Sequence, residues 1–145
     1  MIIRNSEWKS FSKYLIALPD RSIINAEING QKLRFEVVNT RDSLSQGLSG
    51  RKEIGSDGML FVFAGEKTYR TFWMPNMYFD LDILWLNENK VVGITYKALV
   101  EAKGMPLNKY RYYPSNAPTN VVLEVISGKA SDLGIKVGDI IMFKQ

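Results

Sequence analysis

The feature that most constrains this sequence is a series of short, β-prone apolar runs separated by turn residues. After Gly58 the runs are Met59–Phe63, Thr71–Met74, Leu81–Leu86, Val91–Tyr96, Val121–Ser127 and Asp139–Phe143. Many short strands with turn signals between them favour a sandwich or barrel over alternating strands and helices. A chain of 145 residues is long enough for one such core. We therefore predict a mainly β fold: a compact, single-domain antiparallel sandwich or jelly-roll-like barrel with one or two short helices.

Two hairpins are predicted from their turns. Asn29 and Gly30 separate the β-prone runs Ile23–Ile28 and Lys32–Val38. This dipeptide readily adopts the positive φ angles that a two-residue hairpin turn needs. The polar stretch Asn87–Lys90 separates two further runs in the same way.

The N-terminal segment has the spacing of a short amphipathic helix. Apolar residues recur three and four positions apart, at Trp8, Phe11, Leu15 and Leu18. Asn5 or Ser6 can cap this helix and Pro19 ends it. We expect the helix to pack on the domain, and the alternative is a sticky face for a membrane or a protein partner.

Two later segments lack strand periodicity. Residues Arg41–Leu48 are predicted to form one or two helical turns capped by Thr40. Residues Lys97–Pro118 form the longest predicted loop. We place the domain boundary at residue 30: residues 1–30 form an N-terminal extension with the short helix and the first strand, and residues 31–145 form the β domain.

Composition excludes several kinds of chemistry. The chain has no cysteine and no histidine, which removes thiolate sites, the usual zinc ligands and every Ser-His or Cys-His pair. We therefore expect no cofactor and no metal. The 19 basic and 15 acidic residues are spread along the chain, so a nucleic acid is not the expected partner, although Tyr110–Tyr113 alternates aromatic and basic groups.

No segment has the length and hydropathy of a signal peptide core or a transmembrane span. We therefore expect a cytoplasmic protein.

Several short strings occur in an order that is similar to a known family. They are Thr40-Arg41, Gly47-Leu48 with Arg51, Gly58-Met59-Leu60-Phe61, Phe72-Trp73-Met74 with Asn76, Leu81-Asp82-Ile83, Val91-Val92, Val122-Leu123-Glu124 with Gly128, and Leu133-Gly134-Ile135 with Gly138-Asp139. Together they resemble domain-of-unknown-function family 192, over roughly residues 31–143. The resemblance implies a jelly-roll-like, single-domain β fold and no agreed biochemical activity.

The chain departs from that family pattern at three places. Ser49 stands where the family usually has Met, Pro75-Asn76-Met77 replaces a Lys-Asn-Thr string, and Asp80 replaces a Pro.

Two arginines are the first candidate binding residues. Arg41 and Arg51 bracket the short helix, and two converging guanidinium groups can clamp a carboxylate, a phosphate or sugar hydroxyls. The alternative is structural, with each arginine paired to a carboxylate such as Asp82 or Glu124.

A second candidate group follows the run that begins at Thr71. Trp73, Met74 and Asn76 combine an aromatic face, a thioether and an amide, which suits stacking on a sugar or a base. Neighbours on a strand face opposite sides, so one of Trp73 and Met74 is expected in the core.

Two acids lie inside apolar strands. Asp82 and Glu124 each have apolar neighbours on both sides, and a buried carboxylate is costly unless it is paired. They are either a carboxylate pair of glycosidase type or two residues that arginines neutralise.

The function predicted from these residues is a non-catalytic binding module for a small polar or carbohydrate-like ligand. Its cleft is expected to be lined by Arg41, Arg51, Trp73 and Asn76. One alternative is a hydrolase that uses Asp82 and Glu124, and another is a protein-interaction module that uses the N-terminal helix. The sequence leaves the oligomeric state open.

Overall fold

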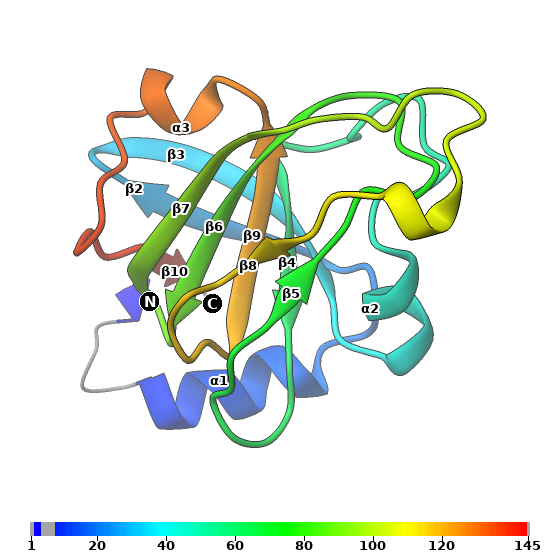
Figure 1. Ribbon diagram of the computed structural model, residues 1–145. Coiled ribbons are helices and arrows are strands. Elements are labelled where there is room, and N and C mark those ends of the chain that lie inside the picture. The colour runs from blue at the N-terminus through cyan, green and yellow to red at the C-terminus, as the bar shows by residue number, and fades with distance from the viewer. Residues whose placement is uncertain (1, 4–7, 145) are drawn as a thin grey trace.

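A computed structural model of the protein describes residues 2–3 and 8–144, with side chains from residue 13 to residue 144. These residues form one eight-stranded sheet and a two-stranded ribbon (Figure 1). From edge to edge the sheet contains β1 (Ile2–Ile3), β10 (Met142–Lys144), β2 (Ile23–Ile28), β3 (Gln31–Val38), β4 (Gly58–Val62), β9 (Val121–Ile126), β6 (Leu81–Asn87) and β7 (Lys90–Ala98). The ribbon consists of β5 (Thr71–Phe72) and β8 (Tyr113–Pro114). The helices are α1 (Trp8–Ala17), α2 (Arg41–Gln46), α3 (Lys129–Asp132) and the 3-10 turn η2 (Leu107–Lys109). The predicted mainly β fold is confirmed.

One pair of neighbouring strands is parallel, whereas the sequence analysis predicts an antiparallel sheet. β3 and β4 run in the same direction, with Phe35 opposite Gly58 and Val38 opposite Phe61. A parallel pair needs a crossover of about a dozen residues or more, and residues 39–57, which include α2, provide it. The sheet is therefore mixed, and the antiparallel sandwich or jelly-roll-like barrel is not confirmed.

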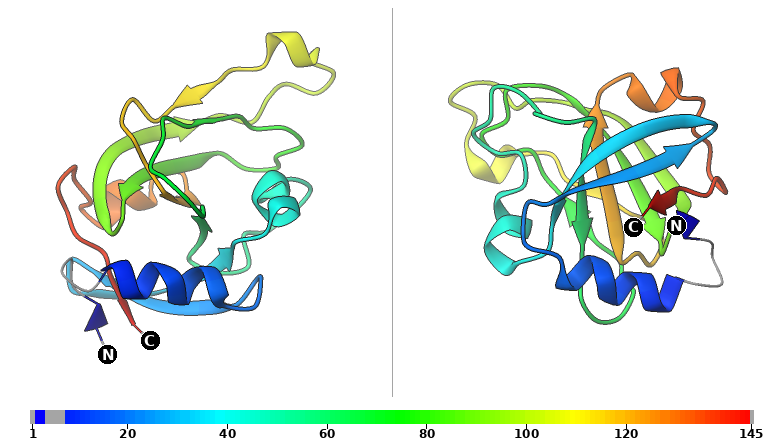
Figure 2. Two further views of the ribbon diagram at one scale, coloured as in Figure 1. Left: turned by 90° about the horizontal axis from the view of Figure 1, so that it is seen from below. Right: turned by 180° about the vertical axis from the view of Figure 1, so that it is seen from behind.

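The sheet curls into a half-barrel. Seen from below, β6 and β7 arch over one side while β2 and β3 lie on the other (Figure 2). An isolated bridge joins Lys90 at the start of β7 to Ile140, and the Val91 N–H donates to the Asp139 carbonyl at 2.9 Å. The chain just before β10 thus reaches across to β7.

The first predicted hairpin is confirmed. β2 and β3 are antiparallel, with Ile28 opposite Gln31. The two turn residues, Asn29 and Gly30, have φ angles of 50° and 77°, as a tight hairpin turn requires. The Asn29 side chain also donates to the carbonyls of Leu133 and Gly134, so the turn is tied to the end of the chain.

The central strands β4, β9 and β6 are buried on both faces. The face that we call the α1 face carries a cluster that includes Leu15 of α1 together with Phe35, Leu60, Leu84, Leu123 and Phe143. The opposite face, which we call the ribbon face, carries Met59, Phe61, Ile83, Trp85 and Val122, with Leu48 and Phe72 packed on them. Strands covered on both sides have nearly continuous apolar sequences, which explains why these runs were recognisable.

The N-terminal helix packs on the domain, as the sequence predicts. Leu15 is fully buried in the α1-face cluster and Leu18 packs against it. The Asn39 amide donates to the carbonyls of Leu15, Ile16 and Leu18, at 3.0, 3.1 and 2.9 Å. These carbonyls lie at the C-terminal end of α1, where they have no partner within the helix.

The side chains of Trp8 and Phe11 and the expected caps Asn5 and Ser6 lie outside what the structure describes. A partner-binding role for the helix stays a prediction.

The segment predicted as the longest loop contains regular structure. It includes the end of β7, then η2, then β8, which pairs with β5. The part around η2 projects from the sheet (yellow in Figure 1). The predicted strand Thr71–Met74 is correspondingly shorter, because only Thr71 and Phe72 pair with β8.

Asn39→Ala is expected to destabilise the protein by about 1 to 3 kcal/mol, because it leaves the carbonyls at the end of α1 without their donor. Urea unfolding measures the loss, and hydrogen exchange should show faster exchange in α1. Asn108→Ala, at an exposed position of η2, is the control and should change stability by less than about 0.5 kcal/mol. Equal effects of the two changes would contradict this role of Asn39.

Candidate functional site

A cavity of about 190 Å³ lies on the ribbon face. Its lining comes from the end of α2, the β5 ribbon strand and the residues after it, and strands β4 and β9. The lining residues are Ser45, Gln46, Gly47, Leu48, Ser49, Phe61, Thr71, Phe72, Trp73, Met74, Pro75, Met77 and Glu124. The cavity therefore combines three aromatic rings, two thioethers, several hydroxyl and amide groups and one carboxyl.

Glu124 is the acidic residue of this lining among the described residues. On β9 it lies between Met59 of β4 and Ile83 of β6, both of which face the same side of the sheet. The residue is 4% exposed, and no described residue donates a hydrogen bond to the carboxyl. Burial raises the pKa of Glu124 to about 8, because the charged form loses its hydration without gaining a partner.

The C-terminal end of α2 borders the cavity beside the Glu124 carboxyl. Thr40 caps the helix through the Ser43 N–H, as predicted. The helix ends at Gly47, whose φ is 52°. A Cβ at this glycine would lie 3.0 Å from the Phe61 ring and 4.0 Å from Oε1 of Glu124. A side chain here would be strained and would enter the cavity, so glycine keeps it open.

Trp73 forms an aromatic rim at the cavity. It is 40% exposed, and its ring stacks on Tyr112 at 6.0 Å with an interplanar angle of 9°. Tyr110 contacts it at 5.7 Å. Met74 is buried, so Met74 is the core member of the pair, as the sequence analysis expects of one of the two.

Below Trp73, aromatic rings hold β5 on the sheet. Phe72 makes edge contacts with Phe61 at 5.1 Å and with Trp85 at 5.2 Å. The position of Trp73, one residue further along the chain, is therefore fixed by a partly buried neighbour.

Two departures from the family pattern contact each other at the cavity wall. Ser49 Oγ donates to the Pro75 carbonyl at 2.7 Å, and Gly50 N–H donates to the Asn76 carbonyl at 2.8 Å. Asn76 itself lines a neighbouring cavity of about 500 Å³ instead. Met74 and Met77 line both cavities, so these thioethers form the wall between them.

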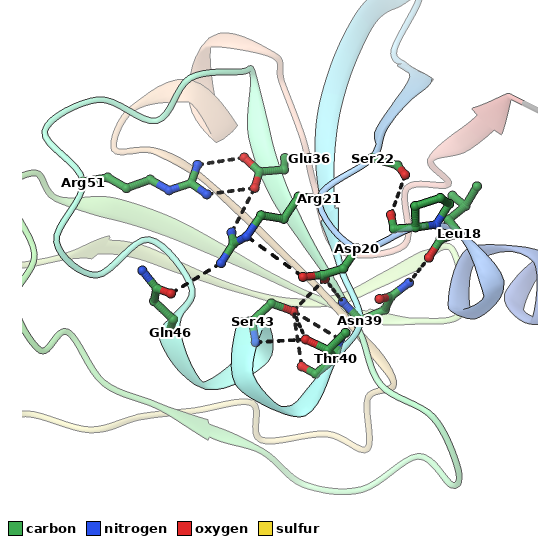
Figure 3. A network of polar contacts seen from close by, with 11 residues as sticks. Leu18, Asp20, Arg21, Ser22, Glu36, Asn39, Thr40, Ser43, Gln46 and Arg51 are labelled. Atoms are coloured by element: carbon green, nitrogen blue, oxygen red, sulfur yellow. Dashed lines mark hydrogen bonds and ion pairs between the residues drawn. The ribbon is translucent and has the colours of Figure 1, made fainter.

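The predicted arginine clamp is not formed at the cavity. Arg51 makes two hydrogen bonds to Glu36, at 2.7 and 2.8 Å, and Arg21 makes a third at 3.1 Å (Figure 3). The Arg51 guanidinium is the main reason that the pKa of Glu36 is lowered, and the same contact raises the pKa of Arg51. Arg41 is exposed at the start of α2 and does not line the cavity.

The structure does not bring Asp82 and Glu124 together. On the neighbouring strands β6 and β9, Asp82 is opposite Val125 and Ile83 is opposite Glu124. Cross-strand partners share a face and neighbours along a strand alternate, so the two carboxyls point to opposite faces of the sheet.

Asp82 has a structural role on the α1 face. Its carboxylate accepts hydrogen bonds from the backbone N–H groups of Lys97, Gly128 and Ala130, at 3.0, 2.9 and 3.1 Å. Gly128 and Ala130 lie at the start of α3, where backbone N–H groups have no partner within the helix.

Three of the seven predicted site residues thus line the cavity: Trp73, Met74 and Glu124. Sequence reasoning did not single out Phe61 and Phe72 as site residues, and it missed Glu36 as the partner of Arg51. Gly47, Leu48, Phe61 and Phe72 belong to the strings that carry the family resemblance. Glu36 has the signal used for Asp82, since it is an acid inside an apolar strand.

Within the described residues, no group of three or more Asp or Glu side chains is arranged to hold a metal ion. In the same part of the chain, no helix is long and apolar enough to cross a membrane.

The fold and the site define a class: a mainly β domain in which a curled mixed sheet buries one unpaired carboxyl beside a small cavity. The chain belongs to the DUF192 family, described as "Uncharacterized ACR", whose model matches residues 24–143. No curated protein matches the chain.

Two crystal structures are similar. A "putative transcription regulator" from Sinorhizobium meliloti 1021 is 24% identical, with a TM-score of 0.72 over 86% of this chain and 96% of that chain. A protein of unknown function from Novosphingobium aromaticivorans DSM 12444 is 31% identical, with a TM-score of 0.67 over 82% of this chain and 81% of that chain. The first similarity shows the fold alone.

The protein is expected to lose stability as pH rises from about 5 to about 9. The pKa of Glu124 is 4.5 in its ordinary state and about 8 in the folded protein, so the folded state holds this proton more tightly. The resulting stabilisation is complete below the unfolded pKa and is lost as pH rises through the folded one. It amounts to about 5 kcal/mol, since the two pKa values differ by about 3.5 and a difference of one corresponds to about 1.4 kcal/mol.

Urea unfolding at a series of pH values measures this loss. Glu124→Gln should remove most of it, whereas Glu66→Gln, the same change at an exposed position, should leave it intact. A flat wild-type profile would contradict the burial of an unpaired carboxyl.

Arg51→Ala should destabilise the protein by about 1.5 to 3 kcal/mol, because it removes two charge-assisted hydrogen bonds from the buried Glu36. Arg41→Ala should change stability by less than about 0.5 kcal/mol, because its side chain is exposed. Chemical denaturation of both variants gives the comparison. A large loss for Arg41→Ala would mean that it has a structural contact after all.

Proposed function

We propose that the protein is a non-catalytic binding module. It takes a small polar or carbohydrate-like ligand into the cavity beside Glu124. The observation that carries this proposal is the buried Glu124 carboxyl, which has no hydrogen-bond partner among the described residues and lines an open cavity. Buried polar groups in native proteins nearly always have partners. A ligand that supplies the missing hydrogen bonds would remove this cost.

The remaining lining fits a binding role. Phe72 and Trp73 offer apolar surface, and Ser45, Gln46 and Thr71 offer polar groups at the same cavity. Ligand sites usually combine apolar surface with a few convergent polar groups, and this lining has both. The cavity is small, so it would hold a compact ligand or one group of a larger one.

Catalysis by a carboxylate pair is less well supported. A glycosidase needs two carboxyls about 5 to 9.5 Å apart across one cleft, and Asp82 and Glu124 face opposite sides of the sheet. Glu36 faces the same side as Glu124, since Glu36 and Glu124 both pair with Met59. However, Glu36 is occupied by Arg51 and does not line the cavity.

A thermal-shift screen of sugars, amino compounds and small anions tests the proposal. A ligand at about 100 times its dissociation constant adds about 2.7 kcal/mol of stability, which raises the midpoint by several degrees. We expect Trp73→Ala to reduce this shift strongly, because the ring forms the rim of the cavity. Its own cost in stability should be about 1 to 2 kcal/mol, since the side chain is partly exposed and loses two ring contacts.

Tyr96→Ala is the matched control, because Tyr96 is an exposed aromatic residue on β7 away from the cavity lining. It should leave the ligand shift unchanged. Equal loss of the shift in both variants, or a screen in which no compound shifts the midpoint, would reject the cavity as a binding site.

A further inference from the structure

We infer that the group bound in this cavity is a protonated amine, whose nitrogen forms an ion pair with the carboxylate of Glu124. This inference rests on the proposed function, because it names the chemical class of the ligand for the same cavity. It follows from what the cavity provides and from what it lacks.

No described residue donates to the Glu124 carboxyl, and the described lining contains no lysine or arginine. A Cβ at Gly47 would lie 4.0 Å from Oε1 of Glu124 and 3.0 Å from the Phe61 ring, so the end of α2 brings no side chain to the carboxyl at this position. The ligand therefore has to supply the donors, and an ammonium group supplies three without adding an acceptor.

The aromatic and thioether side chains of the cavity also suit an ammonium group. Phe61, Phe72 and Trp73 line the same cavity as Glu124. Aromatic faces attract cations, and this attraction is larger where water is excluded. The thioethers of Met74 and Met77 complete a soft, apolar wall. A carboxylate that shares its cavity with three aromatic rings suits a cation better than it suits an anion, which it would repel.

Formation of the ion pair requires the Glu124 carboxyl to lose its proton. Burial raises the pKa of Glu124 to about 8, so at neutral pH the carboxyl is mostly protonated. Binding of an ammonium ion favours the carboxylate, so the carboxyl proton leaves to solvent and the ion pair forms. No bond other than this O–H bond breaks.

No other titratable group among the described residues faces Glu124 from the elements packed around it. β4 and β6 present Met59 and Ile83, and the end of α2 presents Ser45 and Gln46. Glu36 lies two strands away on the same face and is held ionised by Arg51. Proton release on binding can therefore be assigned to Glu124.

An ammonium group can come from a free small amine or from the lysine side chain of a protein. The two sources share the same chemistry at Glu124. They are separated by using n-pentylamine as one probe and N-acetyl-lysine methylamide as the other, with 1-pentanol as a neutral probe of similar shape.

The experiment is isothermal titration calorimetry of the full chain with each probe at pH 6, 7 and 8, in buffers of different ionisation enthalpy. We expect the amines to bind and 1-pentanol to bind far more weakly. Amine affinity should rise by about tenfold from pH 6 to pH 7 and by about fivefold from pH 7 to pH 8, because the carboxyl must lose its proton first. The heats in the different buffers should show close to one proton released at pH 7.

Glu124→Gln should abolish the pH dependence and the proton release, whereas Glu66→Gln should keep both. The wild-type pH profile tests the inference even if the Glu124 variant folds poorly. Tighter binding of the lysine analogue than of pentylamine would identify a protein side chain as the source, and the reverse would identify a free amine.

Equal binding of 1-pentanol and pentylamine, amine binding without proton release, or no amine binding at any pH would overturn the inference. The proposed function would survive these results if the thermal-shift screen finds another ligand that depends on Trp73. It would fail only if no compound binds at the cavity.

Discussion

The structure depends on the burial of strands β4, β9 and β6 on both faces. Because these strands are apolar almost throughout, each face needs its own cover. α1 and α3 contribute to the cover of one face, and α2 with the β5–β8 ribbon contributes to that of the other. The second cover is assembled from short pieces, and the cavity lies where the end of α2 meets β5. The site is thus a consequence of how a doubly buried sheet is closed.

Two glutamates on the ribbon face illustrate how the surroundings decide the state of one chemical group. Glu36 and Glu124 both lie beside Met59 across neighbouring strands. Two arginines lower the pKa of Glu36, whereas burial without a partner raises that of Glu124. The contacts with Arg51 and Arg21 therefore favour the ionised form of Glu36. The burial of Glu124 favours its protonated form. Divergent pKa values of this kind are common at functional sites.

Local signals predicted much of the fold, and long-range pairing accounts for the rest. The turn at Asn29, the cap at Thr40 and the apolar central strands depend on near neighbours, and the structure confirms them. The parallel register of β3 and β4 depends on a crossover that no local pattern specifies. The site was limited in the same way. The sequence shows that Asp82 and Glu124 each lie within a strand, but only the register between β6 and β9 shows that their side chains lie on opposite faces of the sheet.

The strand order at the edge of the sheet has a consequence for synthesis of the chain. β10 lies between β1 and β2, so β1 has no neighbour in the sheet until β10 has been made. The β2–β3 hairpin and the central strands can assemble during translation, since domains begin to form as the chain emerges. The edge, in contrast, can be completed only when β10 has been made and pairs with β2. During that interval β2 presents an open strand edge, which is where another chain could pair by mistake.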